Sequence, residues 1–258
     1  MPVRSAEELH QAIEAYLDAL PLTNELGGLE DSLRYSLDSG GKRIRPILCL
    51  AVTEAAGGSV ETALPAATAV ELVHTFSLVH DDLPALDDDA ERRGRPSTHV
   101  AFGEGVALLA GDALLSEAFR LVLDYERPEP ARELVQATLG MIGGQYLDIT
   151  GDHSDLADLH RLKTGQLFSA AVGLGLWVAG TSEAERTPWR AFGAELGLLF
   201  QVVDDILDGD GFAERLGVEG ARKLADTAAD RAREQLASIS ADTVTLGELL
   251  DGIVARTG

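Results

Sequence analysis

Apolar residues recur at helical spacing along almost the whole chain. Segments with a period near 3.6 residues predict helices, with boundaries good to a few residues, over 6–20, 28–39, 44–57, 61–82, 104–125, 129–149, 155–180, 184–208, 213–238 and 243–256. No sustained apolar–polar alternation occurs, and no hairpin signature lies between two strand-like runs. Glycines follow several of these segments and prolines begin others, as at many helix ends and starts. The pattern therefore predicts about ten helices and no sheet.

The helical segments follow one another without a linker, an internal repeat or a low-complexity tract. A chain of 258 residues can bury a substantial core as one large domain. We therefore expect a single all-α domain over residues 1–258, with too many helices for a simple four-helix bundle.

Composition narrows the class of protein. The formal net charge of −22 argues against nucleic acid as a partner, because phosphate contacts need a basic surface. No uncharged apolar run is long enough for a membrane span, and the N-terminus lacks a signal-peptide pattern. We expect a cytoplasmic protein that does not span a membrane. The single cysteine, Cys49, lies in an apolar run and is predicted to be a core residue.

One apolar helix ends in a dense group of charges. The segment "ELVHTFSLVHDDLPALDDDAERRGRPSTH" places Asp81 and Asp82 together, then Asp87 with two further aspartates. Pro84 is expected to distort or end the helix between them. The side chains of Asp81 and Asp87 can therefore converge only if the backbone bends there.

A second apolar helix ends in the same way, in "LGLLFQVVDDILDGDGF". Asp204, Asp205 and Asp208 are spaced so that the three carboxylates share one helical face. Grouped carboxylates in an apolar setting repel one another, and hard divalent cations such as Mg²⁺ relieve that repulsion.

Each aspartate cluster taken alone is also explained as a solvated helix end. Two such clusters, each continuing a strongly apolar helix, favour a metal site. Zinc is not expected, because no cysteines lie nearby and the histidines are not paired at ligand spacing. Mg²⁺ bound through few carboxylates usually shares its coordination with substrate phosphates.

The few basic residues supply partners for such phosphates. Lysine occurs only three times in the chain, and two of the three lie in short clusters that are candidate anion sites. The candidates are Lys42 and Arg45 after two glycines, Arg92 and Arg93 beside the first aspartate cluster, and Lys163 with Thr164. For any single one of these residues, a solvated helix surface is the alternative. No nucleotide-binding glycine motif is present.

Taken in order, these segments resemble the trans-prenyltransferases, or isoprenyl diphosphate synthases, and most closely the bacterial short-chain farnesyl diphosphate synthases. The resemblance covers residues 28–208 through "GGKRIRP", the long segment above, "GEGVALLAGDALL", "GGQYLDI", "RLKTGQLF" and "FQVVDDILD". It implies an all-α barrel around a deep apolar cavity, usually in a homodimer. It also implies two aspartate motifs that face each other across the mouth and hold three Mg²⁺ ions on an allylic diphosphate.

The resemblance assigns roles to particular residues. The expected metal ligands are Asp81, Asp82, Asp87, Asp204, Asp205 and Asp208. Contacts with isopentenyl diphosphate are implied for Lys42, Arg45, His74 and Arg93. Contacts around the allylic diphosphate or the reacting carbon are implied for Arg92, Lys163, Thr164 and Gln201. The residues implied to act in catalysis are Lys163, Thr164, Asp81 and Asp204.

The same resemblance implies a product length. Phe76, followed by Ser77, precedes Asp81 by five residues, or about 7.5 Å along a helix axis. In this family a bulky residue there forms a floor beneath the growing chain. Together with the two extra residues "PA" in the first motif, it implies condensation of isopentenyl diphosphate with a dimethylallyl or geranyl diphosphate to give farnesyl diphosphate. The alternatives are a C10 or C20 product, and ordinary core packing for Phe76.

The resemblance fails after the second aspartate motif. The family normally continues there with lysine-bearing segments that help to hold the allylic diphosphate. This chain has only Arg215, Arg222 and Lys223 nearby, none in a recognisable equivalent position. Another cation could substitute, or diphosphate binding could be weaker, or activity could be lost, as in a noncatalytic prenyltransferase subunit. A terpene cyclase is not expected, because its usual second metal motif is absent.

Overall fold

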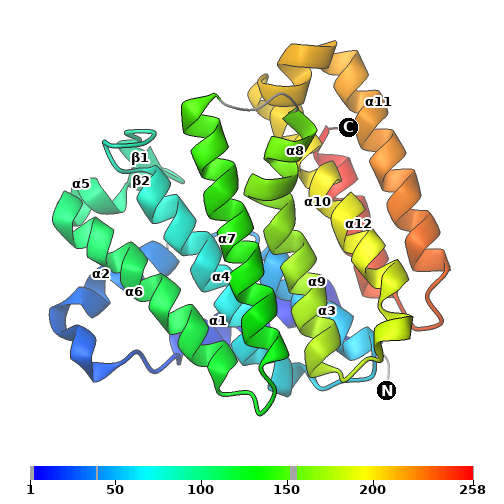
Figure 1. Cartoon of the computed structure of the whole chain (residues 1–258), viewed down its shortest axis with the longest axis horizontal. Coiled ribbons are helices and arrows are strands. Elements are labelled where there is room, and N and C mark those ends of the chain that lie inside the picture. Colours follow the sequence, from blue (N-terminus) through cyan, green and yellow to red (C-terminus); the bar gives the residue numbers. More distant parts are fainter. Residues whose placement is uncertain (1–2, 39, 152–155, 258) are drawn as a thin grey trace.

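Helices form nearly all of the regular structure in residues 3–38, 40–151 and 156–257, which the computed structural model describes (Figure 1). The α-helices are α1 (Ala6–Asp18), α2 (Glu30–Leu37), α3 (Ile44–Ala55), α4 (Val60–Asp81), α5 (Thr98–Phe102), α6 (Glu104–Leu123), α7 (Glu129–Thr150), α8 (Leu156–His160), α9 (Gln166–Val178), α10 (Thr187–Asp208), α11 (Gly211–Ala237) and α12 (Val244–Val254). Short 3₁₀ turns cover Asn24–Leu29, Glu183–Glu185 and Ala255–Thr257, and a π-helical turn covers Arg161–Gly165.

The all-α prediction is confirmed, and each expected helix has its counterpart. Two of the expected ranges include residues 39 and 155, which lie outside the described residues. The range 155–180 divides into α8, the π turn and α9, and α11 is kinked at Gly217, where φ is 72°. The short helix α5 has no counterpart among the predicted segments.

The expectation of no hairpin was wrong. The strands β1 (Glu91–Arg92) and β2 (Arg95–Pro96) pair antiparallel. The two residues between them, Arg93 and Gly94, have φ of 55° and 75°, as a two-residue hairpin turn requires. Each strand has only two residues, so no alternating pattern could reveal it.

Local sequence explains where the long helices start and stop. Helix α1 begins with a capping box, in which the Glu8 N–H donates to Ser5 Oγ and the Ser5 N–H donates to Glu8 Oε2. Helices α7 and α10 both carry proline in their first turn and end at a glycine in the left-handed region, Gly151 and Gly209.

Helix α4 lies at the centre of the bundle and packs against α3, α6 and α9 (Figure 1). It is long and apolar enough to cross a membrane, yet 67% of its most apolar window is buried inside the protein, as in the core helix of a soluble fold. Cys49 on α3 is fully buried, as predicted. At Gly175 on α9 a Cβ would lie 2.7 Å from the Cys49 carbonyl oxygen, so glycine permits the close approach of α3 and α9.

Helices α4 and α10, which carry the two aspartate motifs at their C-terminal ends, both end at the upper side of the molecule in Figure 1. The fold therefore brings to one side two motifs that are more than a hundred residues apart in the sequence.

Candidate active site

The backbone bends sharply after α4. The helix ends at Asp81, and the Asp87 N–H donates to the Asp81 carbonyl oxygen at 2.9 Å. Pro84 lies inside this bend, because its ring and missing N–H prevent the helix from continuing. The first and last aspartates of the motif are therefore held together by the backbone.

Asp82, the second aspartate of this motif, pairs with an arginine of the hairpin. Its side chain is buried and accepts a hydrogen bond from Arg92 Nε at 2.9 Å, while Arg92 Nη2 also donates to Asp89 at 2.9 Å. Burial alone would lower the pKa of Arg92, but the hydrogen bond and charge of Asp82 raise it overall. Asp82, which was expected to bind metal, and Arg92, which was expected to contact diphosphate, thus form an ion pair with each other. This ion pair holds the hairpin of β1 and β2 against the end of α4.

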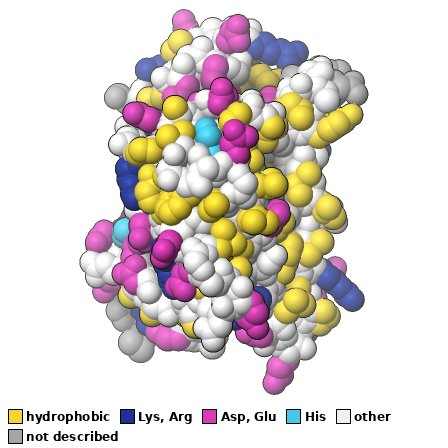
Figure 2. Space-filling view, turned by 90° about the vertical axis from the view of Figure 1, so that its left-hand side faces the viewer, with side chains coloured by type: hydrophobic (Ala, Val, Ile, Leu, Met, Phe, Trp, Pro, Cys, Tyr) yellow, Lys and Arg dark blue, Asp and Glu magenta, His cyan; other side chains and the backbone are white. Residues whose placement is uncertain are grey.

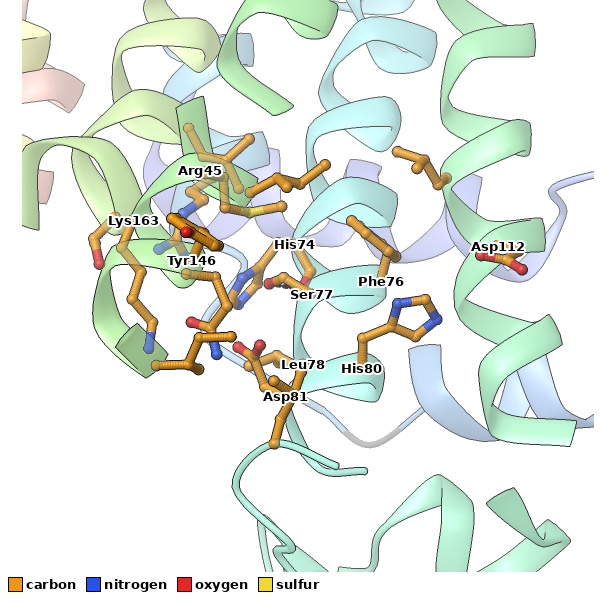
Figure 3. Close-up of a pocket in the computed structure, with 18 residues that line it drawn as sticks. Arg45, His74, Phe76, Ser77, Leu78, His80, Asp81, Asp112, Tyr146 and Lys163 are labelled. Carbon is orange, nitrogen blue, oxygen red and sulfur yellow. Dashed lines mark hydrogen bonds between the residues drawn. The ribbon is translucent and has the colours of Figure 1, made fainter. Parts of the chain in front are cut away.

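A cavity of about 540 Å³ lies beside the C-terminal half of α4. Its wall is largely apolar, with Phe76 on α4, Leu115 on α6 and Met141 on α7. Asp81 and Lys163 are the charged groups at one end, as Figure 3 shows. Further lining residues are Arg45, His74, Ser77, Leu78, His80, Leu86, Asp112, Ile142, Gln145, Tyr146, Ile149, Thr164 and Leu167. The cavity is therefore open rather than filled by side chains.

A smaller, basic cavity of about 240 Å³ adjoins it, and Arg45 and His74 line both. Its lining includes the four residues expected to contact isopentenyl diphosphate, together with two arginines that had no role assigned from the sequence: Lys42, Arg45, His74 and Arg93, with Arg43 and Arg256. Asp204 of the second aspartate motif lies on its edge. The structure thus brings the four sequence-predicted contacts into one pocket.

The cluster Lys42-Arg43-Arg45 is divided by its backbone. Arg43 adopts the left-handed region, with φ of 45°, and its guanidinium is buried against Glu14 and Glu71 at 2.6 and 2.7 Å. Arg43 lines the basic cavity as Lys42 and Arg45 do, but its guanidinium is paired with Glu14 and Glu71, so it stabilises the fold.

Arg45 is a cation without an acidic partner among the described residues. Its Cζ lies 4.7 Å from the ring centroid of Phe168 and 5.5 Å from that of Phe200. Burial lowers the pKa of Arg45 to about 10, so the side chain keeps its charge at neutral pH. Burial and the neighbouring arginines hold the pKa of His74 well below its usual value, so this imidazole is neutral.

The three aspartates of the second motif, like those of the first, have different surroundings. Asp204 Oδ1 lies 2.7 Å from Arg256 Nη1, and Asp208 is exposed. Asp205 is buried, and its carboxylate accepts hydrogen bonds from Gln201 Nε2 at 2.6 Å and from the Phe212 N–H at 2.8 Å. Asp205 therefore joins α10 to the start of α11, and Asp204 is the member that lines a cavity.

Asp205 also anchors a chain of hydrogen bonds to the main cavity. Thr164 Oγ1 donates to Gln201 Oε1 at 2.6 Å, and Gln201 Nε2 donates to Asp205 Oδ1. Thr164 belongs to the π-helical turn Arg161–Gly165, a conformation found often at functional sites. Lys163 in the same turn forms an ion pair with Asp148 of α7.

A glycine on α7 makes room for this turn. A Cβ at Gly144 would lie 2.5 Å from the Lys163 backbone nitrogen, whereas a Cβ at the adjacent Gly143 would meet nothing within 4 Å. The motif "GGQYLDI" thus lets α7 approach the backbone that carries Lys163 and Thr164.

The carboxylates suit a divalent cation that is completed by a substrate. Burial raises the pKa of Asp81 to about 6, with Lys163 acting against this effect, and burial also raises the pKa of Asp204. Both groups would gain from a nearby positive charge. Within the described residues, no three His, Cys, Asp or Glu side chains already converge as a metal site. Phosphate oxygens would have to supply the remaining ligands, as is usual for Mg²⁺.

Sequence reasoning missed three groups here. Gln145 lines the main cavity, and neither polar atom of its buried amide has a partner among the described residues. Asp148 holds Lys163. Both belong to a motif that was recognised without roles for its members. Arg256 follows Asp208, the last residue of the recognised motifs, by 48 residues, so no sequence signal marked it.

The segment after Asp208 is short, as the missing lysine segments indicated. Only Gly209 and Asp210 separate α10 from α11. The cations that follow, Arg215, Arg222 and Lys223, are exposed on α11, and Lys223 pairs with Glu219 at 3.0 Å. None of them lines either cavity.

Comparison with known proteins agrees with this geometry. A family model described as polyprenyl synthetase matches residues 27–226. The chain is 40% identical to a geranylgeranyl diphosphate synthase of Cyanophora paradoxa, covering 88% of this chain and 87% of that protein. It is 35% identical to a farnesyl diphosphate synthase of Bacillus subtilis, covering 96% and 94%. Among solved structures, a geranyltransferase from Legionella pneumophila superposes with a TM-score of 0.87 at 32% identity, covering 98% and 96%.

The chain belongs to the polyprenyl synthetase family, and it is a prenyltransferase that elongates prenyl chains. This confirms the family, the fold and the enzyme class inferred from the sequence motifs. Its relatives include both farnesyl and geranylgeranyl diphosphate synthases, so the product length has to be argued from the cavity.

Proposed function

We propose that the protein joins isopentenyl diphosphate to an allylic diphosphate, dimethylallyl or geranyl, by a Mg²⁺-dependent head-to-tail (1′–4) condensation that yields farnesyl diphosphate. The observation that carries this proposal is the arrangement of two adjoining cavities, one basic and one apolar, that share Arg45 and His74. A basic pocket suits a diphosphate that must be positioned, and an apolar cavity suits a hydrocarbon chain.

In this proposal the basic cavity holds isopentenyl diphosphate. Lys42, Arg45 and Arg93 supply positive charge. His74 is neutral, so it can position the substrate through a hydrogen bond without adding a charge. Holding the double bond against the allylic carbon removes much of the entropic barrier of a bimolecular step.

The allylic diphosphate would lie at the charged end of the main cavity, with its hydrocarbon tail along the apolar wall. Asp81 and Asp204, assisted by Asp87 and Asp208, are the residues that would hold Mg²⁺. Such ions, three if the resemblance holds for this site, would stabilise negative charge on a departing diphosphate. Lys163 lines this end of the cavity and adds fixed positive charge there.

The chain's own groups then control the allylic cation. The apolar wall around Phe76 and Met141 excludes water that would quench the cation. Thr164 lines the main cavity and would present its oxygen atom near the reacting carbon. Gln201, itself held by Asp205, fixes the Thr164 hydroxyl through a hydrogen bond. Loss of a proton, taken up by the departing diphosphate, completes the new double bond.

Phe76 supports a farnesyl product. It lines the cavity five residues before Asp81, its side chain is only 8% exposed, and a growing chain would meet its ring. Ser77, the neighbouring candidate for length control, lines the same cavity with a smaller side chain. A geranylgeranyl product is the alternative favoured by relatives such as the Cyanophora paradoxa enzyme.

We also propose a homodimer, based on an apolar stripe along α7. Five side chains spaced four, three, four and three residues apart are between 40 and 59% exposed: Val135, Leu139, Ile142, Tyr146 and Ile149. This is the spacing of a helix–helix seam. Leu108 and Leu109 of α6 are exposed as well, and Figure 2 shows hydrophobic side chains gathered across the face on which α6 lies. A second copy would cover an apolar surface of this kind. Ile142, Tyr146 and Ile149 also line the main cavity, so the second copy would close that side of it.

The proposed function is tested by incubating the purified protein with Mg²⁺, isopentenyl diphosphate and dimethylallyl, geranyl or farnesyl diphosphate, then separating the products by chain length. We expect a C15 product from the first two starters and little elongation of the third. Efficient conversion to C20 would favour the geranylgeranyl alternative. Absence of condensation with every starter would favour a noncatalytic subunit, the alternative that the missing lysines suggest.

A cytoplasmic location stays a prediction, tested by cell fractionation.

A further inference from the structure

The ring of Phe76 is braced by a neighbour on its own helix. His80 lies four residues further along α4, on the same face, and the two ring centroids are 4.8 Å apart at an interplanar angle of 69°. Figure 3 shows His80 directly beside Phe76, with both side chains directed toward α6. This edge-to-face contact limits the rotamers that Phe76 can adopt.

His80 is in turn fixed by α6. Its Nε2 lies 3.0 Å from the carbonyl oxygen of Leu108. Because a carbonyl can only accept, Nε2 carries the proton and donates this hydrogen bond. One turn further along α6, a Cβ at Gly111 would lie 2.1 Å from His80 Nε2 and 2.3 Å from Cδ2. Any residue other than glycine at this position would displace the imidazole.

The same cavity continues on the α6 side of Phe76. His80, Asp112 and Leu115 all line it together with Phe76. A chain that grows past the floor has to push the Phe76 ring aside, and the imidazole occupies the space beside that ring. The barrier to further elongation thus depends on whether His80 can move, and α6 holds it in place.

We infer that His80 and Gly111 help to determine product length by fixing the ring of Phe76. They are positioning residues, because they act through Phe76 rather than on the reacting atoms. The inference rests on the proposed function and refines its last step, the termination of chain growth. The alternative is a purely structural role, in which His80 packs α4 against α6 and does not affect product length.

The test compares product lengths from geranyl diphosphate and isopentenyl diphosphate for the wild-type chain and three variants. We expect His80→Ala and Gly111→Ala each to raise the C20:C15 ratio about tenfold, the scale of one hydrophobic pocket contact. Gly105→Ala is the matched control, because it lies on the same helix and its Cβ would meet nothing within 4 Å. It should leave the ratio unchanged.

A double variant separates positioning from direct contact. If His80 acts through Phe76, the product lengths of Phe76→Ala/His80→Ala will equal those of Phe76→Ala alone. A further increase in the double variant would overturn the inference, since His80 would then be an independent wall of the cavity. An unchanged ratio in His80→Ala and Gly111→Ala would overturn it as well.

Thermal unfolding of each variant is the control that shows whether the variant is folded. His80→Gln provides a second probe of the same contact, because its amide can still donate toward Leu108 but offers no ring to Phe76. It should lengthen products as His80→Ala does, and normal products from a folded His80→Gln chain would contradict the inference. Failure of the wild-type chain to condense any substrate would instead overturn the proposed function itself.

Discussion

Arg256 Nη1 lies 2.7 Å from Asp204 Oδ1, so the end of the described chain reaches the second aspartate motif. The charge of Arg256 opposes the rise that burial causes in the pKa of Asp204. Arg256 also lines the basic cavity beside Lys42 and Arg93. Arg256 therefore adds a positive charge to the cavity that is proposed to hold isopentenyl diphosphate.

Replacing Arg256 tests whether it contacts substrate. Arg256→Gln should raise the KM for isopentenyl diphosphate about tenfold, since a charge-assisted hydrogen bond contributes roughly 1.5–3 kcal/mol. The KM for the allylic substrate should change less than about twofold, which is within the effect of an indirect contact. Steady-state kinetics with each substrate varied in turn measures both values. Arg222→Gln, at an exposed position on α11, is the control, and an equal effect from it would remove Arg256 from this role.

Arg45→Lys tests the shape of the cation rather than its charge. The guanidinium lies over Phe168 and Phe200, and an ammonium cannot stack in this way or present two parallel donors. We expect kcat/KM for isopentenyl diphosphate to fall ten- to hundredfold, or about 1.4–2.7 kcal/mol. The exposed Arg215→Lys should be neutral. Full activity in Arg45→Lys would mean that charge alone is recognised.

Asp81→Asn should remove activity and yet stabilise the free protein. The folded-state pKa of Asp81 is raised from its usual 3.8 to about 6, because burial disfavours the charged form. The buried charge of Asp81 therefore lowers the free energy of unfolding fully above about pH 6. This loss of stability becomes smaller as the pH falls, and it disappears near about pH 4. Urea unfolding at pH 7.5 should show Asp81→Asn more stable by on the order of 1–2 kcal/mol, and the difference should narrow at pH 5.

The control for this comparison is Asp87→Asn. Its carboxylate is exposed, so the substitution should change stability by less than about 0.5 kcal/mol at either pH. If Asp81→Asn is as stable as the wild-type chain or less so at pH 7.5, its carboxylate is compensated in the free protein.

Gly144→Ala and Gly143→Ala form a matched pair. A Cβ at Gly144 would collide with the Lys163 backbone, whereas one at Gly143 meets open space. Gly144→Ala should displace the π turn, lower kcat at least tenfold and destabilise the fold by about 1–3 kcal/mol through overpacking. Gly143→Ala should retain kcat and fold normally. Similar kinetics in the two variants would show that the turn tolerates displacement.

Leu139→Asp tests the proposed dimer. A charge in the middle of the α7 stripe would be buried without a partner in the interface, so we expect monomers. Sedimentation velocity measures the assembly, and Val244→Asp, an equally exposed apolar position at the start of α12, should leave it unchanged. A monomeric wild-type chain would refute the dimer directly.

The amino-acid sequence by itself determined the helices and the chemistry of the site. Apolar periodicity is a local property, so ranges such as 61–82 and 184–208 could be predicted and correspond to α4 and α10. The order of motifs was specific enough to give the family. Lys42, Arg45, His74 and Arg93 were named from motifs, and they lie around one pocket.

Only the tertiary structure decided which member of each charged cluster faces a cavity. Neighbours such as Asp81 and Asp82, or Asp204 and Asp205, have the same chemistry and differ only in direction. That direction depends on partners far away in the sequence, such as Phe212, whose N–H binds Asp205. The contacts of Arg256 with Asp204 and of His80 with Gly111 likewise join separate helices. Packing creates such contacts, and no pattern along one segment can encode them.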